Sequence, residues 1–127
     1  MSIKSYEDLE IYQNAYNIAL KIHGIISDLP KTEQFEEGSQ VRRSSKSIAV
    51  NIVEGFGRRR YKNEFIKFLT YAKASCDETI VHLRFLHDTG NIEKERYEDL
   101  KIELNDLSRK IYKFILSVEE GHNKFLR

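Results

Sequence analysis

Apolar side chains recur at the three- and four-residue spacing of an α-helix along most of the chain. No stretch shows the alternating apolar and polar pattern of a β-strand. The pattern predicts four helices, over about residues 5–28, 39–54, 63–90 and 93–119. Because short connections join them, neighbouring helices should pack antiparallel. We therefore expect an all-α, antiparallel up-down four-helix bundle over residues 6–119, followed by a frayed tail at residues 120–127.

Local signals support these helix ends. Ser5 is a good N-cap for the first helix, and Leu29-Pro30 should stop that helix because proline disfavours helical geometry in the residue before it. Asn63 can cap the third helix, and Gly90 suits its C-terminal end. Gly55 and Gly57 tolerate a left-handed backbone, so we expect the second helix to end there and the chain to turn.

The second helix divides into three sectors around its axis. A core row should face the bundle interior: Val41, Ser45, Ile48 and Ile52, with Ala49 beside it. A row of small polar residues should allow close packing: Ser44, Ser47 and Asn51. The third row is basic: Arg42, Arg43 and Lys46. Val50 and Val53 lie in this basic sector, where solvent is the simple expectation, so we expect another subunit to cover part of it.

The third helix is apolar on two sides. Its core row holds Phe65, Leu69, Ala72, Cys76, Ile80 and Leu83. Ala74, Val81 and Phe85 lie about 180° away, and a second apolar side in a small bundle is typical of a protein–protein contact. The first helix is also apolar over more than one core requires. These surpluses predict a homo-oligomer, with cyclic symmetry as the usual closed form.

Basic residues are concentrated in the middle of the chain. Residues 38–62 carry seven Lys and Arg against one acid, whereas the whole chain has a net charge of only +1. The candidate nucleic-acid-binding set is Arg42, Arg43, Lys46, Arg58, Arg59, Arg60 and Lys62. Guanidinium groups bind phosphate oxygens with little sequence preference. Alternatively, these residues are simply solvated, or Arg42 and Arg43 pair with acids of a neighbouring subunit.

The composition excludes several classes of function. A chain of 127 residues fits one domain, and no apolar run is long enough for a membrane span or a signal peptide, so we expect a cytoplasmic protein without membrane contact. Cys76 has no second cysteine with which to pair. Only Glu119 and His122 show the Glu-x-x-His spacing of a di-iron bundle, so we expect no metal and no cofactor. Signatures of catalytic triads or phosphate loops are missing, and we expect no enzyme.

Asn51 and Glu54 suggest an active site, but a structural role fits them better. Both lie one turn before the two glycines, where Asn51 can hydrogen-bond across helices and Glu54 can bind turn donors or an arginine. Phe56, between Gly55 and Gly57, should anchor the turn against the core.

The residues also resemble a known family. YEDLEIYQNA near the start, LPK, QVRRSSKSIAVNIVEGFGRR and NEFIKFLTYAKASCDE resemble the four-helix-bundle proteins encoded in intervening sequences of bacterial 23S ribosomal RNA genes, over residues 6–118. The most specific part is RR-x-x-x-SI-x-x-NI-x-EGFGR, from Arg42 to Arg58. Tyr12, Ala74 and Cys76 depart from the residues expected in the family, and Arg60-Tyr61-Lys62 makes the turn more basic than usual.

The resemblance implies a small bundle that assembles as a homopentamer. It also implies kinship with the accessory variability proteins of diversity-generating retroelements, which bind nucleic acid and a reverse transcriptase. Two hypotheses follow. The first is a non-catalytic, oligomeric bundle that binds the backbone of RNA or DNA through its basic surface. The second is a scaffold that recruits a protein partner, such as a nucleic-acid enzyme, and has no nucleic-acid affinity of its own.

Overall fold

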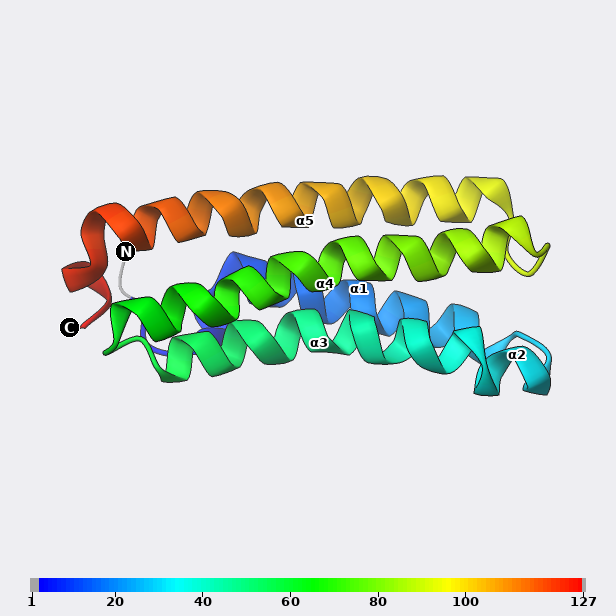
Figure 1. Cartoon of the computed structure of the whole chain (residues 1–127), viewed down its shortest axis with the longest axis horizontal. Helices are drawn as coiled ribbons and strands as arrows, with labels where there is room; N and C mark the ends of the chain where they lie inside the picture. Colours follow the sequence, from blue (N-terminus) through cyan, green and yellow to red (C-terminus); the bar gives the residue numbers. More distant parts are fainter. Residues whose placement is uncertain (1–2, 127) are drawn as a thin grey trace.

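The computed structural model describes residues 3–126, and helices account for most of them. The elements in chain order are η1 (Tyr6–Asp8), α1 (Glu10–Ser27), α2 (Lys31–Phe35), α3 (Glu37–Gly57), α4 (Lys62–Asp88), α5 (Lys94–Gly121) and η2 (His122–Phe125). The four long helices α1, α3, α4 and α5 run alternately in opposite directions (Figure 1). The all-α, up-down bundle predicted from the hydrophobic pattern is confirmed, and residues 3–126 contain no strand.

Each long helix contacts two others, so the bundle closes on itself. α3 packs on α1 and α4, and α5 packs on α4 and α1. The α3–α4 pairing is the most extensive. α1 begins and α5 ends at the same end of the bundle as the α3–α4 turn (Figure 1). This arrangement places the basic turn beside the C-terminal segment.

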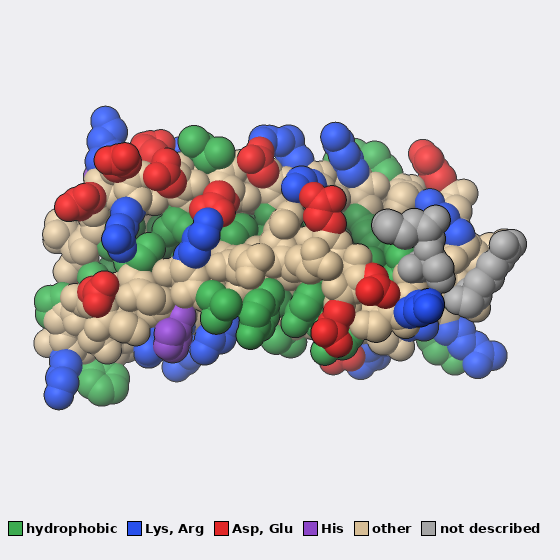
Figure 2. All heavy atoms as spheres, turned by 180° about the vertical axis from the view of Figure 1, so that it is seen from behind, with side chains coloured by type: hydrophobic (Ala, Val, Ile, Leu, Met, Phe, Trp, Pro, Cys, Tyr) green, Lys and Arg blue, Asp and Glu red, His purple; other side chains and the backbone are tan. Residues whose placement is uncertain are grey.

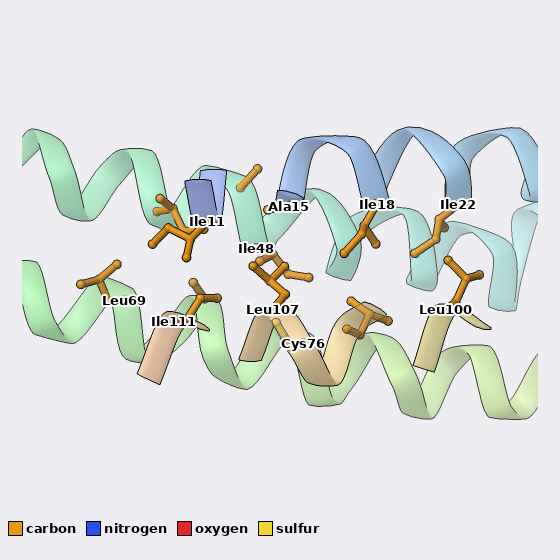
Figure 3. Close-up of a cluster of buried hydrophobic side chains, with 14 of the residues drawn as sticks. Ile11, Ala15, Ile18, Ile22, Ile48, Leu69, Cys76, Leu100, Leu107 and Ile111 are labelled. Carbon is orange, nitrogen blue, oxygen red and sulfur yellow. The ribbon is translucent and has the colours of Figure 1, made fainter. Parts of the chain in front are cut away.

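The core consists of branched aliphatic side chains from all four long helices. Figure 3 shows Ile18 and Ile22 of α1, Ile48 of α3 and Leu107 of α5 in one cluster, and all four are buried. The core rows predicted for α3 and α4 are buried except for Ile80, which is half-buried. Helical periodicity alone therefore identified the interior faces.

The first helix is interrupted where a continuous helix was expected. Ser5 caps the short turn η1, and Asp8 completes a capping box by accepting a hydrogen bond from the Ser5 amide at 3.1 Å. Leu9 is extended and buried, and α1 begins only at Glu10. These amide donors also lower the pKa of the Asp8 carboxyl, with the Lys4 amide as the largest cause.

The two glycines do not break α3, contrary to the expectation. The helix continues through Gly57, and among residues 3–126 only Gly90 has a positive φ, of 80°. Gly55 is buried because α4 approaches it: a Cβ there would lie 3.2 Å from the Phe65 carbonyl oxygen and from the Phe68 Cβ. Glycine at 55 therefore permits a close helix contact and does not supply a turn.

The C-terminal segment does not fray within the described residues. After α5, the chain folds back as η2, and the Phe125 side chain is only 8% exposed. Its ring lies 5.5 Å from that of Phe65 and 5.3 Å from that of Phe114. Aromatic packing orders this segment; of the expected frayed tail, only Arg127 lies outside the described residues.

Candidate nucleic-acid interface

The seven predicted cationic residues fall into two groups. Arg42, Arg43 and Lys46 lie in the first half of α3, and Arg58, Arg59, Arg60 and Lys62 lie at or next to the α3–α4 turn. Because α3 rises about 1.5 Å per residue, the two groups are roughly 24 Å apart along the helix axis. The basic stretch of sequence therefore does not fold into one continuous patch.

Three cations of the second group are held by contacts within the chain. Arg58 pairs with Glu54 at 3.2 Å and Glu64 at 3.1 Å. The Arg59 Nε donates to the Phe125 carbonyl oxygen at 3.1 Å, and its guanidinium group stacks 4.2 Å from the centre of the Phe56 ring. Both arginines therefore stabilise the turn through contacts within the chain.

Lys62 is the third of these cations. Its Nζ donates to the Glu119 carbonyl oxygen at 2.8 Å. That carbonyl lies in the last turn of α5, where unpaired carbonyl groups attract cations. The contact therefore ties the start of α4 to the end of α5.

The other four predicted cations are not neutralised inside the chain. Arg43, Lys46 and Arg60 are exposed, and Arg42 is half-buried. Within residues 3–126, none of the four forms an ion pair with a carboxylate. Their charge is thus available to an external anion, whereas that of Arg58 is balanced by two acids.

The small polar row on α3 faces α4. Ser47 shares a 2.7 Å hydrogen bond with Ser75 of α4, and Thr79 of α4 lies 2.9 Å from the Ser44 hydroxyl. Asn51, which we expected to bridge two helices, instead donates to the Ser47 carbonyl oxygen of its own helix at 2.9 Å. These side chains have structural partners and lie in the α3–α4 contact.

Phe56 is buried, with its ring 6.3 Å from that of Phe65. Glu54 pairs with Arg58 as described above.

Among residues 3–126, no group of three or more His, Cys, Asp or Glu side chains is placed to hold a metal ion. His122, one of the two residues with di-iron spacing, uses its Nε2 to donate to the Arg59 carbonyl oxygen at 2.6 Å.

An apolar groove of about 750 Å³ runs between α1 and α3. Its lining residues are Tyr6, Tyr12, Tyr16, Ala19, Leu20, His23, Lys46, Ala49, Val50, Val53, Glu54 and Gly57. Val50 is 63% exposed, and a band of hydrophobic side chains is visible along this face in Figure 2. We call the apolar side chains Tyr16, Leu20 and Val50, which are exposed, and Val53, which is half-buried, the groove surface.

A second exposed apolar surface lies on α4. It consists of Tyr71, Ala74, Val81 and Phe85, and we call it the α4 surface. Phe85 is 56% exposed. The five residues predicted as oligomer contacts therefore lie on two separate surfaces, with Val50 and Val53 on one and Ala74, Val81 and Phe85 on the other.

Sequence reasoning missed the contribution of the C-terminal segment to this region. Phe125, His122 and Glu119 all contact the basic turn or its supporting ring cluster. The only sequence signal was the apolar pair Phe125-Leu126 within a polar tail.

No helix among residues 3–126 has the length and apolarity needed to cross a bilayer.

Comparison with known proteins identifies the family. The model of the family described as 23S rRNA-intervening sequence protein matches residues 7–113. A crystal structure of a protein with unknown function, from the S23 ribosomal protein family of Bacteroides thetaiotaomicron VPI-5482, superimposes with a TM-score of 0.76 at 24% identity. The match covers 83% of this chain and 94% of that one, and at this identity it shows a shared fold. No curated protein matches the sequence. Since the family model covers most of the chain, as the resemblance implied, the protein belongs to the 23S rRNA-intervening sequence protein family.

Proposed function

We propose that this protein is a non-catalytic, self-associating bundle that binds the phosphate backbone of RNA or DNA. The observation that carries the proposal is that four cations of the basic stretch, Arg42, Arg43, Lys46 and Arg60, form no ion pair with a carboxylate of the described chain. A phosphate oxygen forms charge-assisted hydrogen bonds with such groups and releases counterions from the nucleic acid. Contacts of this kind carry little sequence information, so the proposed binding is largely independent of sequence.

Self-association supports the proposal because it repeats each cation around the assembly. The groove surface and the α4 surface are two apolar regions of the same chain, and exposed apolar patches mark interaction sites. Lys46 lines the groove, with Arg43 close by in the same sector of α3, whereas the acids Asp77 and Glu78 adjoin Val81 on α4. Docking of one surface into the other is a heterologous contact, which forms a ring where the rotation between subunits closes. Such a ring is the pentamer that the family resemblance implies.

The two parts of this proposal compete for Lys46 and Arg43. A neighbouring subunit that fills the groove brings Asp77 and Glu78 toward them, and the ion pairs then reduce their charge toward nucleic acid. Arg60 follows the end of α3 and is not one of the residues that line the groove. Arg60 is therefore the cation whose contribution is least affected by assembly.

The test measures the mass of the protein in solution and its affinity for nucleic acid. Light scattering gives the mass of the purified protein, and fluorescent single- and double-stranded RNA and DNA are then titrated at two salt concentrations. Replacing Arg42, Arg43, Lys46 and Arg60 together by Ala should weaken binding and reduce the salt slope by about 0.7 per lost phosphate contact on single strands.

A matched control removes the same formal charge from paired cations. Lys21, Arg84, Arg109 and Lys110 each contact a carboxylate, so their replacement by Ala should have a much smaller effect. Equal effects of the two sets, or no binding by the wild type, would overturn the proposal.

The second candidate function is a scaffold for a protein partner. The volume and apolar lining of the α1–α3 groove favour it, because an apolar groove can accept a partner helix by its apolar face. Co-purification of a stoichiometric partner, with no nucleic acid retained, would support the scaffold over nucleic-acid binding.

A further inference from the structure

The C-terminal segment and the basic turn hold each other through polar contacts in both directions. Arg59 Nε donates to the Phe125 carbonyl oxygen at 3.1 Å, and His122 Nε2 donates to the Arg59 carbonyl oxygen at 2.6 Å. Lys62 Nζ donates to the Glu119 carbonyl oxygen at 2.8 Å. Two cations of the basic stretch are thus bound to carbonyl groups of the chain's own C-terminal region.

An apolar contact keeps this region in place. The buried Phe125 ring packs edge-to-face on Phe65 at 5.5 Å and nearly parallel to Phe114 at 5.3 Å. By contrast, the neighbouring Leu126 is 48% exposed. Phe125 is therefore the residue that anchors the end of the chain, and we call residues 119–126, which comprise the last turn of α5 and η2, the C-terminal clasp.

We propose that the C-terminal clasp is an autoinhibitory contact that withholds Arg59 and Lys62 from phosphate. The inference rests on the proposed function, since it concerns the regulation of the same cationic region. A phosphate oxygen is a stronger acceptor for a cationic donor than a neutral carbonyl, so an approaching polyanion competes with the clasp for both side chains. Undocking of Phe125 frees Arg59 and Lys62 from their carbonyl partners and raises the number of phosphate contacts.

The clasp is suited to local opening. It consists of the last turn of α5 and the short turn η2, attached by one aromatic anchor and a few hydrogen bonds at the bundle surface. Terminal segments of this kind open at far lower free energy than the core. Opening unwinds only the last turn of α5 and leaves the core rows of the four long helices in place.

The experiment compares Phe125→Ala with Leu126→Ala in the full-length protein. Leu126→Ala is the matched control because it removes an exposed side chain from the same segment. Binding of single-stranded poly(U) RNA is measured across a range of salt concentrations. Phe125→Ala should bind more tightly than the wild type, with a salt slope steeper by about 1.4 for two added phosphate contacts. Leu126→Ala should behave like the wild type.

A second substitution identifies the cation that is released. Lys62→Met keeps an apolar stem and removes the charge. Added to Phe125→Ala, it should reduce the slope by about 0.7, one phosphate contact. No reduction would exclude Lys62 from the released set and would overturn that part of the inference.

Amide hydrogen exchange provides a readout that does not depend on nucleic acid. Phe125→Ala should speed exchange at the Leu126 amide, which is bonded to the Asn123 carbonyl oxygen within the clasp, and leave the Arg59 and Tyr61 amides protected within the turn. Unchanged exchange at Leu126 would overturn the inference and leave the proposed function untouched. If Phe125→Ala fails to fold, Phe125→Leu, with a smaller apolar anchor, takes its place.

The failures of the two proposals are distinguishable. If the wild type binds poly(U) and Phe125→Ala binds with the same slope, the clasp has no inhibitory role and the proposed function stands. If neither protein binds, both proposals fail. If only Phe125→Ala binds, inhibition by the clasp is supported, and the proposed binding by the wild-type protein is overturned.

Discussion

The Cys76 thiol is fully buried on the core face of α4, and burial sets its chemistry. Desolvation of the thiolate raises the pKa of Cys76 to about 12. We predict that the native protein resists alkylation by iodoacetamide at pH 8, because almost no thiolate forms, and reacts readily once unfolded in guanidinium. Mass spectrometry of the labelled protein measures both rates. Rapid labelling of the native protein at a rate independent of denaturant would contradict this prediction.

The same pKa shift predicts how the stability of the folded protein changes with pH. The folded pKa of Cys76 lies above the ordinary value of 9.0, so between these values the native state holds a proton that the unfolded chain releases. Its contribution to stability is therefore fully present below pH 9 and declines as the pH rises toward about 12.

The buried hydroxyl pair between α3 and α4 provides a second prediction for single side chains. Thr79 donates to the Ser75 carbonyl oxygen at 2.7 Å and lies 2.9 Å from the Ser44 hydroxyl, which can donate to it. Thr79→Val should cost about 1–3 kcal/mol of unfolding free energy, because the Ser44 hydroxyl loses a buried partner. Urea denaturation measures this cost.

The double variant Ser44→Ala with Thr79→Val tests the coupling. Because it removes both partners, it should destabilise less than the sum of the single variants. Additive costs would mean that the two hydroxyl groups do not depend on each other. The sequence placed Ser44 in a small polar row. Its partners on α4 depend on the register in which the two helices pack, and the periodicity of one helix cannot predict that register.

Within the element α3, Gly55 and Gly57 have different roles despite their similar sequence context. Gly55 is pressed against α4, whereas a Cβ at Gly57 would have no atom within 4 Å. Gly57→Ala should stabilise the protein by up to about 1 kcal/mol through helix propensity. Gly55→Ala should destabilise it, since the Phe65 backbone and the Phe68 Cβ would have to move. Thermal or urea unfolding of the two variants measures the contrast, and equal effects would contradict it.

A sequence signal for the role of Gly55 was present in the spacing. Ser44, Ser47, Asn51 and Gly55 follow one another at three and four residues, so Gly55 continues the row of small residues that faces α4. The conformational freedom of glycine suggested a turn instead. Packing against a neighbouring helix outweighed local propensity here, as it commonly does in helices whose stability comes from tertiary contacts.

At the scale of the whole molecule, the two exposed apolar surfaces lead to a testable prediction about how copies of the chain assemble. Leu20→Glu places a charge in the groove surface, and Phe85→Glu places one in the α4 surface. In a heterologous assembly, each variant alone should be monomeric, because each lacks one half of every contact. Mixed together, the two variants should form a dimer and nothing larger, since one intact groove meets one intact α4 surface. Light scattering measures all three masses.

A different outcome would point to a different assembly. Dimers of each variant alone, formed through the surface that it keeps, would indicate that each surface pairs with a copy of itself. Full-size assemblies of either variant alone would show that its surface is not a subunit contact.

The bundle itself was predictable because its helices bury continuous rows of side chains at helical spacing, as with Val41, Ile48 and Ile52. The arrangement of the side chains around the basic turn was not predictable from the sequence. Whether Arg58 points toward Glu64 or toward solvent depends on the α3–α4 turn, and whether Arg59 reaches Phe125 depends on where α5 ends. A run of charges in the sequence specifies composition, whereas the fold determines which of these charges are already paired.

The order of the helices around the bundle also has a consequence for folding. α3 contacts α4, α4 contacts α5 and α1 contacts α3, so most of the packing joins segments close in sequence, whereas the α1–α5 contact joins the first and last of the four long helices. Low contact order favours rapid folding, and the extensive α3–α4 hairpin is the natural nucleus. The arginine turn would then form early, and the C-terminal segment that covers it would dock last. During synthesis, the nascent chain would therefore expose these arginines before the residues that cover them have left the ribosome.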